Sequence, residues 1–253
     1  MRLDILAAIV AIKVDAGIFI TGGATGIGAA LVRAFAEQNA QVTFVDLQQE
    51  AGAALVAELD DRVTFHRLDI TDTDVLQQAV TDANERTKLG VLINNAANDM
   101  RHAPSDMTPS QWRDCLAINL DAAFFAAQSA APILAGNGGG SIINFSSINA
   151  VLGPSNMPGY VSAKAGLIGM TKALAKDYGA DMVRVNAISP GWVVTQRQLA
   201  TWLTQQEEAD WMKQVALPKR LMPEDVASLA LFLAADDSSM ITGQNFTIDG
   251  GRT

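Results

Sequence analysis

Apolar residues follow two patterns that alternate along the chain. In the first, short runs rich in valine, isoleucine and phenylalanine are bounded by polar residues or glycine, which is typical of buried strands. In the second, apolar residues recur every three or four positions, which is typical of helices. The first pattern predicts strands at 17–21, 41–46, 62–69, 90–95, 140–146, 182–189 and 245–249. The second predicts helices at 26–38, 48–59, 72–87, 109–135, 159–179, 196–214 and 223–235.

Strands that alternate with helices of this length indicate βαβ units, in which helices connect parallel strands. We therefore predict an α/β fold with a doubly wound, Rossmann-like parallel sheet and helices on both faces. The sequence has no linker-like stretch and no internal repeat, so residues 1–253 are expected to form a single domain. Ligands of such sheets bind beyond the carboxyl ends of the strands, and the chemistry is expected there.

Composition narrows the functional classes. Of 253 residues 49% are hydrophobic and only 18% are charged, which allows a sizeable core and excludes wholesale disorder. The net charge of -9 disfavours nucleic acid and anionic membrane surfaces as partners. Cys115 is the only cysteine, and its spacing from His66 and His102 matches no zinc motif. We therefore expect no metal and a reducing, cytoplasmic location.

The first residues of the chain carry an apolar run at 5–12. This run is too short to span a membrane, and it lacks the features of a signal peptide. Residues 1–15 are expected to form an N-terminal extension, to which the sequence assigns no role.

A glycine-rich turn with Gly22, Gly26 and Gly28 follows the first predicted strand and leads directly into a helix. Backbone amides in such a turn can bind a phosphate group. Asp46 ends the second strand, where a carboxylate can accept hydrogen bonds from a dinucleotide ribose. It would repel a 2′-phosphate by about 4 kcal/mol before screening, and Leu47 adds no positive charge, so NAD is favoured over NADP. A ligand-free turn and a helix-capping aspartate are the alternative interpretations.

A second cluster contains Tyr160 and Lys164, which begin a predicted helix four residues apart and therefore share one of its faces. Ser147 lies at the end of the preceding strand. A lysine ammonium close to a phenol favours the phenolate, so Lys164 is expected to lower the pKa of Tyr160 toward neutrality. A phenol with such a pKa can act as a general base.

With these motifs the chain resembles the short-chain dehydrogenase/reductase family over nearly its whole length. The resemblance is carried by TGGATGIG at 21–28, Asp69-Ile70, NNAA at 94–97 (with Ala97 where the family has glycine), Asn119, Ser147, YVSAK at 160–164, SPG at 189–191 and TGQNFTIDGG at 242–251. It implies a catalytic tetrad of Asn119, Ser147, Tyr160 and Lys164, in which Tyr160 exchanges the hydroxyl proton. It also implies that NAD contacts Gly22, Thr25, Gly26, Ile27, Gly28, Asp46, Leu47, Asp69, Ile70, Asn95, Ala96, Tyr160, Lys164, Pro190, Gly191, Val193 and Thr195.

Polar residues follow the strands that should border the substrate, and a pocket that hydrogen-bonds hydroxyl groups selects substrates that carry them. The run NNAANDMRH, together with VVTQRQ, is similar to the NAD-dependent aldose 1-dehydrogenases of the family, the D-xylose enzymes among them. That similarity implies oxidation of an aldose at C1 to its lactone. The expected substrate contacts are Asn98, Arg101, Ser147, Asn149, Tyr160, Trp192 and Arg197.

Several alternatives stay open. Arg101, His102 and Arg197 leave room for an anionic sugar, such as a sugar acid or sulfosugar, and polyols or 3-oxoacyl groups are other possible substrates. An NADPH-dependent ketoreductase and a dinucleotide-sensing protein without turnover are competing functions. We further expect residues 192–217 to form a substrate lid, and the resemblance implies a homotetramer built through the apolar helices.

Overall fold

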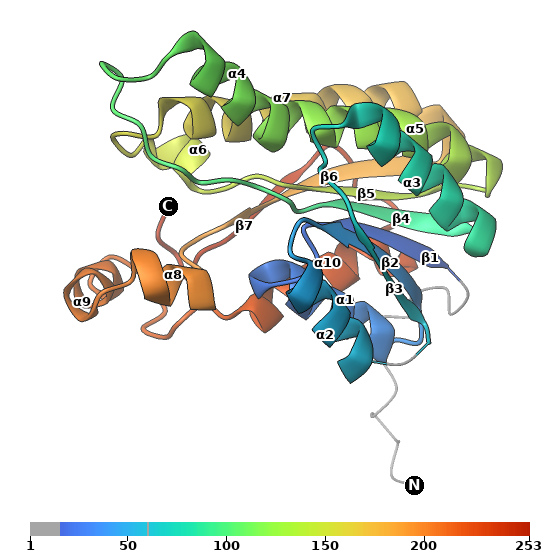
Figure 1. The fold of residues 1–253 in the computed structure, drawn as a ribbon, viewed down its shortest axis with the longest axis horizontal. Helices are drawn as coiled ribbons and strands as arrows, with labels where there is room; N and C mark the ends of the chain where they lie inside the picture. The colour runs from blue at the N-terminus through green and yellow to red at the C-terminus, as the bar shows by residue number, and fades with distance from the viewer. Residues whose placement is uncertain (1–15, 60) are drawn as a thin grey trace, which may run out of the picture.

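The computed structural model describes residues 16–59 and 61–253 (Figure 1). The expected N-terminal extension, residues 1–15, lies outside the described residues. Within the described part the strands are β1 (Gly17–Thr21), β2 (Gln41–Asp46), β3 (Val63–Arg67), β4 (Leu89–Asn94), β5 (Gly140–Phe145), β6 (Val183–Pro190) and β7 (Asn245–Ile248). The α-helices are α1 (Gly26–Glu37), α2 (Gln49–Glu58), α3 (Thr73–Arg86), α4 (Pro109–Leu116), α5 (Ala122–Gly136), α6 (Asn149–Leu152), α7 (Pro158–Tyr178), α8 (Gln196–Thr201), α9 (Gln205–Met212) and α10 (Pro223–Ala234).

The strands form one parallel sheet in the order β3-β2-β1-β4-β5-β6-β7. Helices α1, α2 and α10 cover one face of the sheet, while α3, α5 and α7 cover the other (Figure 1). Each layer of helices closes its own hydrophobic core, because both faces of a parallel strand are apolar. The structure confirms the predicted single domain with a doubly wound sheet.

The strand order places the switch point of the sheet between β1 and β4. The chain runs outward from β1 through β2 to β3, and it then returns to β4 on the opposite side of β1. Segments that leave β1 and β4 therefore diverge at the carboxyl edge, and such a switch point is where folds of this kind bind ligands. The glycine-rich turn leaves β1, and the polar run beginning at Asn98 follows β4.

Three parts of the helical prediction need correction. The helix expected at 196–214 is two helices, α8 and α9, since Thr204 caps α9 in a reciprocal capping box with Glu207. The predicted helix at 109–135 is interrupted by a π-helical turn at Ala117–Asp121, which widens the helix around Asn119. The short helix α6 was not predicted, because four residues are too few to show a helical repeat.

Helices α4 and α5, with the π-helical turn between them, form a continuous helix, Pro109–Gly136. By length and composition alone this helix could cross a membrane. That is weak evidence, because the core helix of a soluble protein passes the same test. Here the buried alanines Ala126, Ala127 and Ala130 of α5 pack into the core on one face of the sheet.

Candidate active site

The glycine-rich turn is fixed to the strands on both sides of β1. The Gly22 amide donates to the Val45 carbonyl of β2 at 2.8 Å. On the other side, the Asn95 side-chain amide donates to the carbonyl groups of Thr21 at 3.0 Å and Gly22 at 2.8 Å. The N-cap residue of α1, Thr25, makes no side-chain hydrogen bond to the helix. The first amides of α1 are thus left for another acceptor, as in helices that bind phosphate.

The glycines of this turn stand where a side chain would clash or strain the backbone. A Cβ atom on Gly28 would lie 1.8 Å from the Gly22 carbonyl oxygen, closer than any non-bonded contact allows. Gly22 and Gly26 both have positive φ angles, 67° and 55°, which glycine adopts without strain. A Cβ on Gly26 would meet the Thr195 methyl group at 3.2 Å, which places Thr195 directly beside the turn.

Asp46 faces the same turn from the end of β2. Its carboxylate accepts a hydrogen bond from the Ala24 amide at 3.0 Å and another from the Gln48 amide at 3.0 Å. Leu47, the next residue, is 58% exposed. The carboxylate is therefore a support of the turn as well as a candidate ribose acceptor, and it is not the N-cap of α2, which is Gln48.

The remaining predicted cofactor residues also lie at the carboxyl edge. The Asp69 carboxylate accepts two hydrogen bonds from Thr71, at 2.9 and 2.7 Å, so it is partly used in a local turn. Gly191 packs so tightly that a Cβ would lie 2.8 Å from the Asp249 main chain. Ile27 lies in the first turn of α1, and Ile70, Ala96, Pro190 and Val193 follow or end β3, β4 and β6.

Tyr160, Lys164 and Ser147 converge at this edge, as predicted. The Lys164 ammonium lies 5.6 Å from the centre of the Tyr160 ring. Lys164 is only 2% exposed, and its Nζ donates to the Phe145 carbonyl at the end of β5, at 2.7 Å. Ser147 is also buried, and its hydroxyl accepts from the Asn149 amide at 3.1 Å.

The pKa of Tyr160 differs from the sequence-based expectation. Burial raises this pKa to about 12, although hydrogen bonding from Ser147 acts in the opposite direction. Burial also lowers the pKa of Lys164 to about 8. The expectation that Lys164 lowers the pKa of Tyr160 toward neutrality is thus wrong for the chain by itself. The cost of burying the phenolate outweighs the neighbouring groups that favour it.

Comparing Lys164→Met with the wild type should reveal the lowered pKa of the buried Lys164 ammonium, through the pH dependence of stability. Since the pKa of Lys164 is about 8 when folded and ordinarily 10.5, the unfolded chain binds more protons between these values. The free energy of unfolding of the wild type should therefore rise, relative to the variant, by about 2 kcal/mol from about pH 7.5 to about pH 10. Urea unfolding of both proteins at the two pH values measures this difference. A difference that does not change with pH would contradict the assignment.

Asn119 lies buried in the π-helical turn and connects the reacting cluster to the loop after β4. Its side-chain oxygen accepts from the Asn98 amide at 3.0 Å, and its amide donates to the Asn98 carbonyl at 3.0 Å. The same amide donates to the Cys115 carbonyl at 2.9 Å. Asn119 therefore fixes the main chain where the predicted substrate loop begins.

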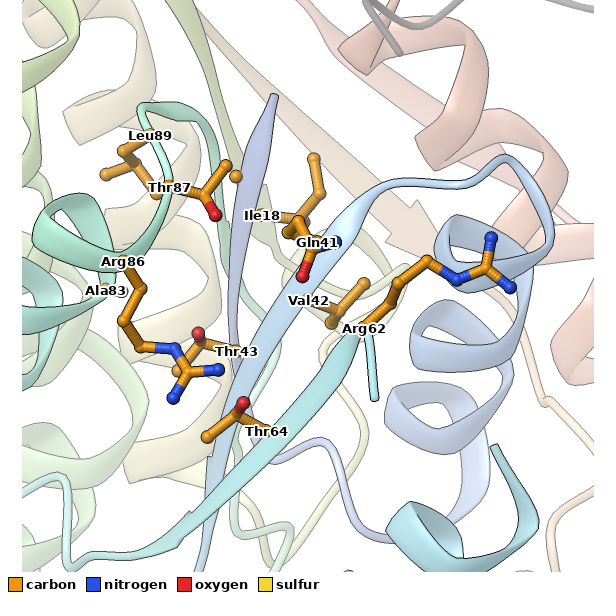
Figure 2. Close-up of a pocket in the computed structure, with 11 residues that line it drawn as sticks. Ile18, Gln41, Val42, Thr43, Arg62, Thr64, Ala83, Arg86, Thr87 and Leu89 are labelled. Carbon is orange, nitrogen blue, oxygen red and sulfur yellow. The ribbon is translucent and has the colours of Figure 1, made fainter. Parts of the chain in front are cut away.

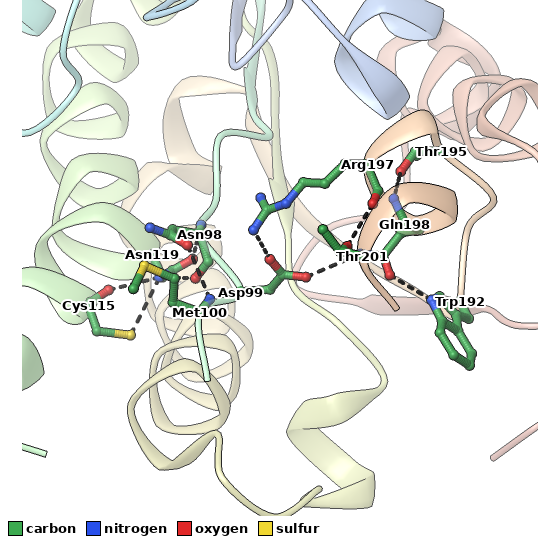
Figure 3. Close-up of polar contacts among 10 residues, drawn as sticks. All are labelled: Asn98, Asp99, Met100, Cys115, Asn119, Trp192, Thr195, Arg197, Gln198 and Thr201. Carbon is green, nitrogen blue, oxygen red and sulfur yellow. Dashed lines mark hydrogen bonds and ion pairs between the residues drawn. The ribbon is translucent and has the colours of Figure 1, made fainter. Parts of the chain in front are cut away.

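Four of the predicted substrate residues lie on two segments that face each other (Figure 3). Asn98 and Arg101 belong to the loop after β4, and Trp192 and Arg197 belong to the segment after β6. Arg197 of α8 forms an ion pair with Asp99, and Gln198 donates to the same carboxylate at 3.1 Å. The Trp192 indole donates to the Gln198 side chain at 2.7 Å. Asp99 and Gln198 belong to the polar segments predicted to border the substrate, but they are not among the expected substrate contacts. The opposite charges of Asp99 and Arg197 were the available signal, but their partnership spans almost a hundred residues.

Aromatic contacts hold the rest of the predicted lid. The Arg101 guanidinium stacks over the Trp202 ring at 4.0 Å, which links the loop after β4 to the residue after α8. Trp192 and Trp211 meet edge to face at 5.4 Å, and Arg252 lies over Trp211 at 5.3 Å. Asn149 begins α6 beside Ser147, with a half-buried side chain. The segment 192–217 is thus joined to the loop after β4 through Trp202 and Arg197.

A separate small cavity of about 10 Å³ lies at the opposite edge of the sheet (Figure 2). Gly17 and Gln41, the first residues of β1 and β2, line it together with Arg86 of α3. This is the amino end of the strands, away from the reacting cluster, so we do not place the chemistry there. Among the described residues no group of three or more histidine, cysteine, aspartate or glutamate side chains could hold a metal ion.

The sheet, its switch point and the cluster around Tyr160 are those of a Rossmann-fold oxidoreductase. More specifically, the chain belongs to the short-chain dehydrogenase/reductase family. The family model described as enoyl-(acyl carrier protein) reductase matches residues 22–253. This finding confirms the family predicted from the sequence motifs.

Two curated relatives and one solved structure illustrate the similarity. The chain is 43% identical over 244 residues to a probable galactose dehydrogenase of Rhizobium meliloti, covering 94% of each chain. It is 40% identical over 237 residues to the D-xylose 1-dehydrogenase of Caulobacter vibrioides, covering 92% of this chain and 94% of the relative. A short-chain type dehydrogenase/reductase from Mycobacterium ulcerans has a similar structure, with a TM-score of 0.89, 27% identity, and coverage of 94% and 90%.

Proposed function

We propose that this chain oxidises an aldose at C1 to its lactone, with NAD as the hydride acceptor and Tyr160 as the general base. The observation that carries the proposal is the convergence of Tyr160, Ser147 and Lys164 at the carboxyl edge, beside the polar loop after β4. The printed names of the two curated relatives, both sugar dehydrogenases, support the choice of substrate class.

The carboxyl edge fits a dinucleotide. The turn leaves no room for a side chain at Gly22 or Gly28, and the amides at the start of α1 lack a side-chain cap, so the pyrophosphate would bind there. Asp46 would accept the adenosine ribose hydroxyls, and it would repel the 2′-phosphate of NADP because Leu47 provides no neutralising charge. Thr195, beside Gly26, would complete the other wall of the cofactor site.

The residues around Tyr160 have distinct proposed roles. Ser147 donates a hydrogen bond to the reacting oxygen of the substrate, and Tyr160 removes the proton from this substrate hydroxyl. Lys164 binds the nicotinamide ribose and places a positive charge beneath the phenol. Asn119 holds Asn98 and the substrate loop in register with this group. When bound in its oxidised form at this edge, NAD would supply the hydride acceptor and a second positive charge, which would favour the phenolate of Tyr160 that burial alone disfavours.

The substrate pocket is proposed to lie between the loop after β4 and the segment after β6. Asn98 and Asn149 offer polar side chains at this site, as a polyhydroxylated substrate requires. Trp192 lies beside them, with its indole held by Gln198. Segment 192–217 is proposed to act as a lid that excludes water during hydride transfer. A cytoplasmic location and a homotetramer that buries the outer faces of α4, α5 and α7 stay predictions.

A substrate panel tests this function. We expect NADH formation, followed by absorbance, with one or more neutral aldoses at mildly alkaline pH. Polyols, sugar acids and 3-hydroxyacyl thioesters serve as competing classes, each tested with NAD and with NADP. Turnover confined to one of these other classes would agree with an oxidoreductase activity but would refute the proposal that the pocket binds an aldose.

A further inference from the structure

The ion pair between Asp99 and Arg197 bridges the mouth of the proposed substrate pocket. Figure 3 shows the Arg197 side chain extending from α8 toward the loop after β4, where it meets Asp99. Gln198 donates to the second carboxylate oxygen at 3.1 Å, so two residues of α8 share one acceptor. The Asp99 side chain is 22% exposed and the Arg197 side chain 53%, so the carboxylate is the better shielded partner.

Asp99 is also held close to the reacting groups. The preceding residue, Asn98, exchanges two main-chain hydrogen bonds with the Asn119 side chain, both at 3.0 Å. The charges of Asp99 and Arg197 both reach the Tyr160 phenol: Asp99 raises its pKa and Arg197 lowers it. A substrate that binds at Tyr160 must therefore experience both charges.

This arrangement changes what Arg197 can do. A free arginine at a pocket mouth would attract a sugar acid or a sulfosugar. Here the guanidinium already has a carboxylate partner, and an incoming anion would have to displace Asp99 or lie beside its negative charge. Arg101, the arginine of the loop after β4 itself, is stacked on Trp202. The pocket therefore presents hydrogen-bonding groups without a free positive charge at the position of Arg197.

We propose that Asp99 is a specificity-determining residue that restricts this active site to neutral sugars, because it occupies Arg197 and places a carboxylate beside the substrate. The inference rests on the proposed aldose dehydrogenase function and deepens it. It decides between the neutral and the anionic sugars that the sequence leaves open, in favour of the neutral ones.

Matched sugar pairs test the inference. D-galactose and D-galacturonate differ only at C6, as do D-glucose and D-glucuronate, and each sugar is measured as a substrate and as a competitive inhibitor. Asp99→Asn keeps an oxygen that can accept from Gln198 but removes the charge and frees Arg197. We expect this variant to shift the ratio of kcat/KM, or of inhibition constants, toward the uronate by about tenfold at low salt. Salt should reduce the shift.

Two further variants separate charge from structure. Asp99→Glu keeps the negative charge and should keep the preference of the wild type for neutral sugars. Adding Arg197→Gln to Asp99→Asn removes the freed cation and should cancel the gain for the uronate. An unchanged ratio in Asp99→Asn, or an equal loss for both sugars of a pair, would overturn the inference. Failure of the wild type to oxidise any neutral aldose would instead refute the proposed function.

Discussion

Tyr160→Phe is expected to lose nearly all turnover while it keeps its affinity for NAD. The substitution removes only the phenolic oxygen, which in our account takes the substrate proton, and general base catalysis of this kind contributes about a hundredfold to ten-thousandfold. We expect kcat to fall by about a thousandfold. Steady-state kinetics measures the loss, and quenching of tryptophan fluorescence on titration with NADH measures cofactor binding.

The chain offers a matched control, because Tyr178 is its only other tyrosine. It lies at the far end of the same helix, α7, about 27 Å further along the helix axis. Tyr178→Phe should keep the activity of the wild type. Turnover that survives in Tyr160→Phe, with binding intact, would refute the assigned base. Loss of activity in both variants would point to a general effect on the helix.

Replacing Asp46 and Leu47 by alanine and arginine should shift the preference from NAD toward NADP by at least about a hundredfold in the ratio of kcat/KM. Repulsion between a carboxylate and a 2′-phosphate amounts to about 4 kcal/mol at an effective dielectric near 20, before screening. The new arginine at the exposed position 47 adds attraction to the same phosphate.

The double variant also loses the hydrogen bond from the Ala24 amide to Asp46, so a second variant is needed. Asp46→Asn removes the charge but keeps a side-chain oxygen that can accept from Ala24, and it should weaken the NAD preference without disturbing the turn. Circular dichroism checks that both proteins fold. If the folded double variant prefers NAD as strongly as the wild type, the role of Asp46 in cofactor choice is wrong.

The sequence predicts the sheet well because both faces of its strands are buried and each strand is a short apolar run. The predicted strand at 62–69 ends early, at Arg67, because β3 is the edge strand and its last residues are exposed. Features that depend on only a few residues leave no mark on the periodic pattern of apolar residues, so the sequence does not predict them. The π-helical turn around Asn119 and the break between α8 and α9 are local departures within otherwise helical patterns.

For the candidate site, too, the sequence predicts local features but not contacts between distant segments. Gly22, Gly28 and Asp46 could be identified because their role follows from a local turn next to a strand. The partnership of Asp99 with Arg197 could not, since it depends on how two distant loops meet in space. The pKa of Tyr160 was also misjudged, because spacing along a helix reveals the neighbouring charge but not the depth of burial.

Transfer of label from C1 tests the central claim most directly. The enzyme is incubated with NAD and an aldose from the panel that carries deuterium at C1, and the NADH is analysed by mass spectrometry. We predict NADH that contains one deuterium, together with the corresponding lactone or its hydrolysis product. NADH without deuterium would show that the hydride leaves another carbon, and it would contradict the assignment of this chain as an aldose 1-dehydrogenase.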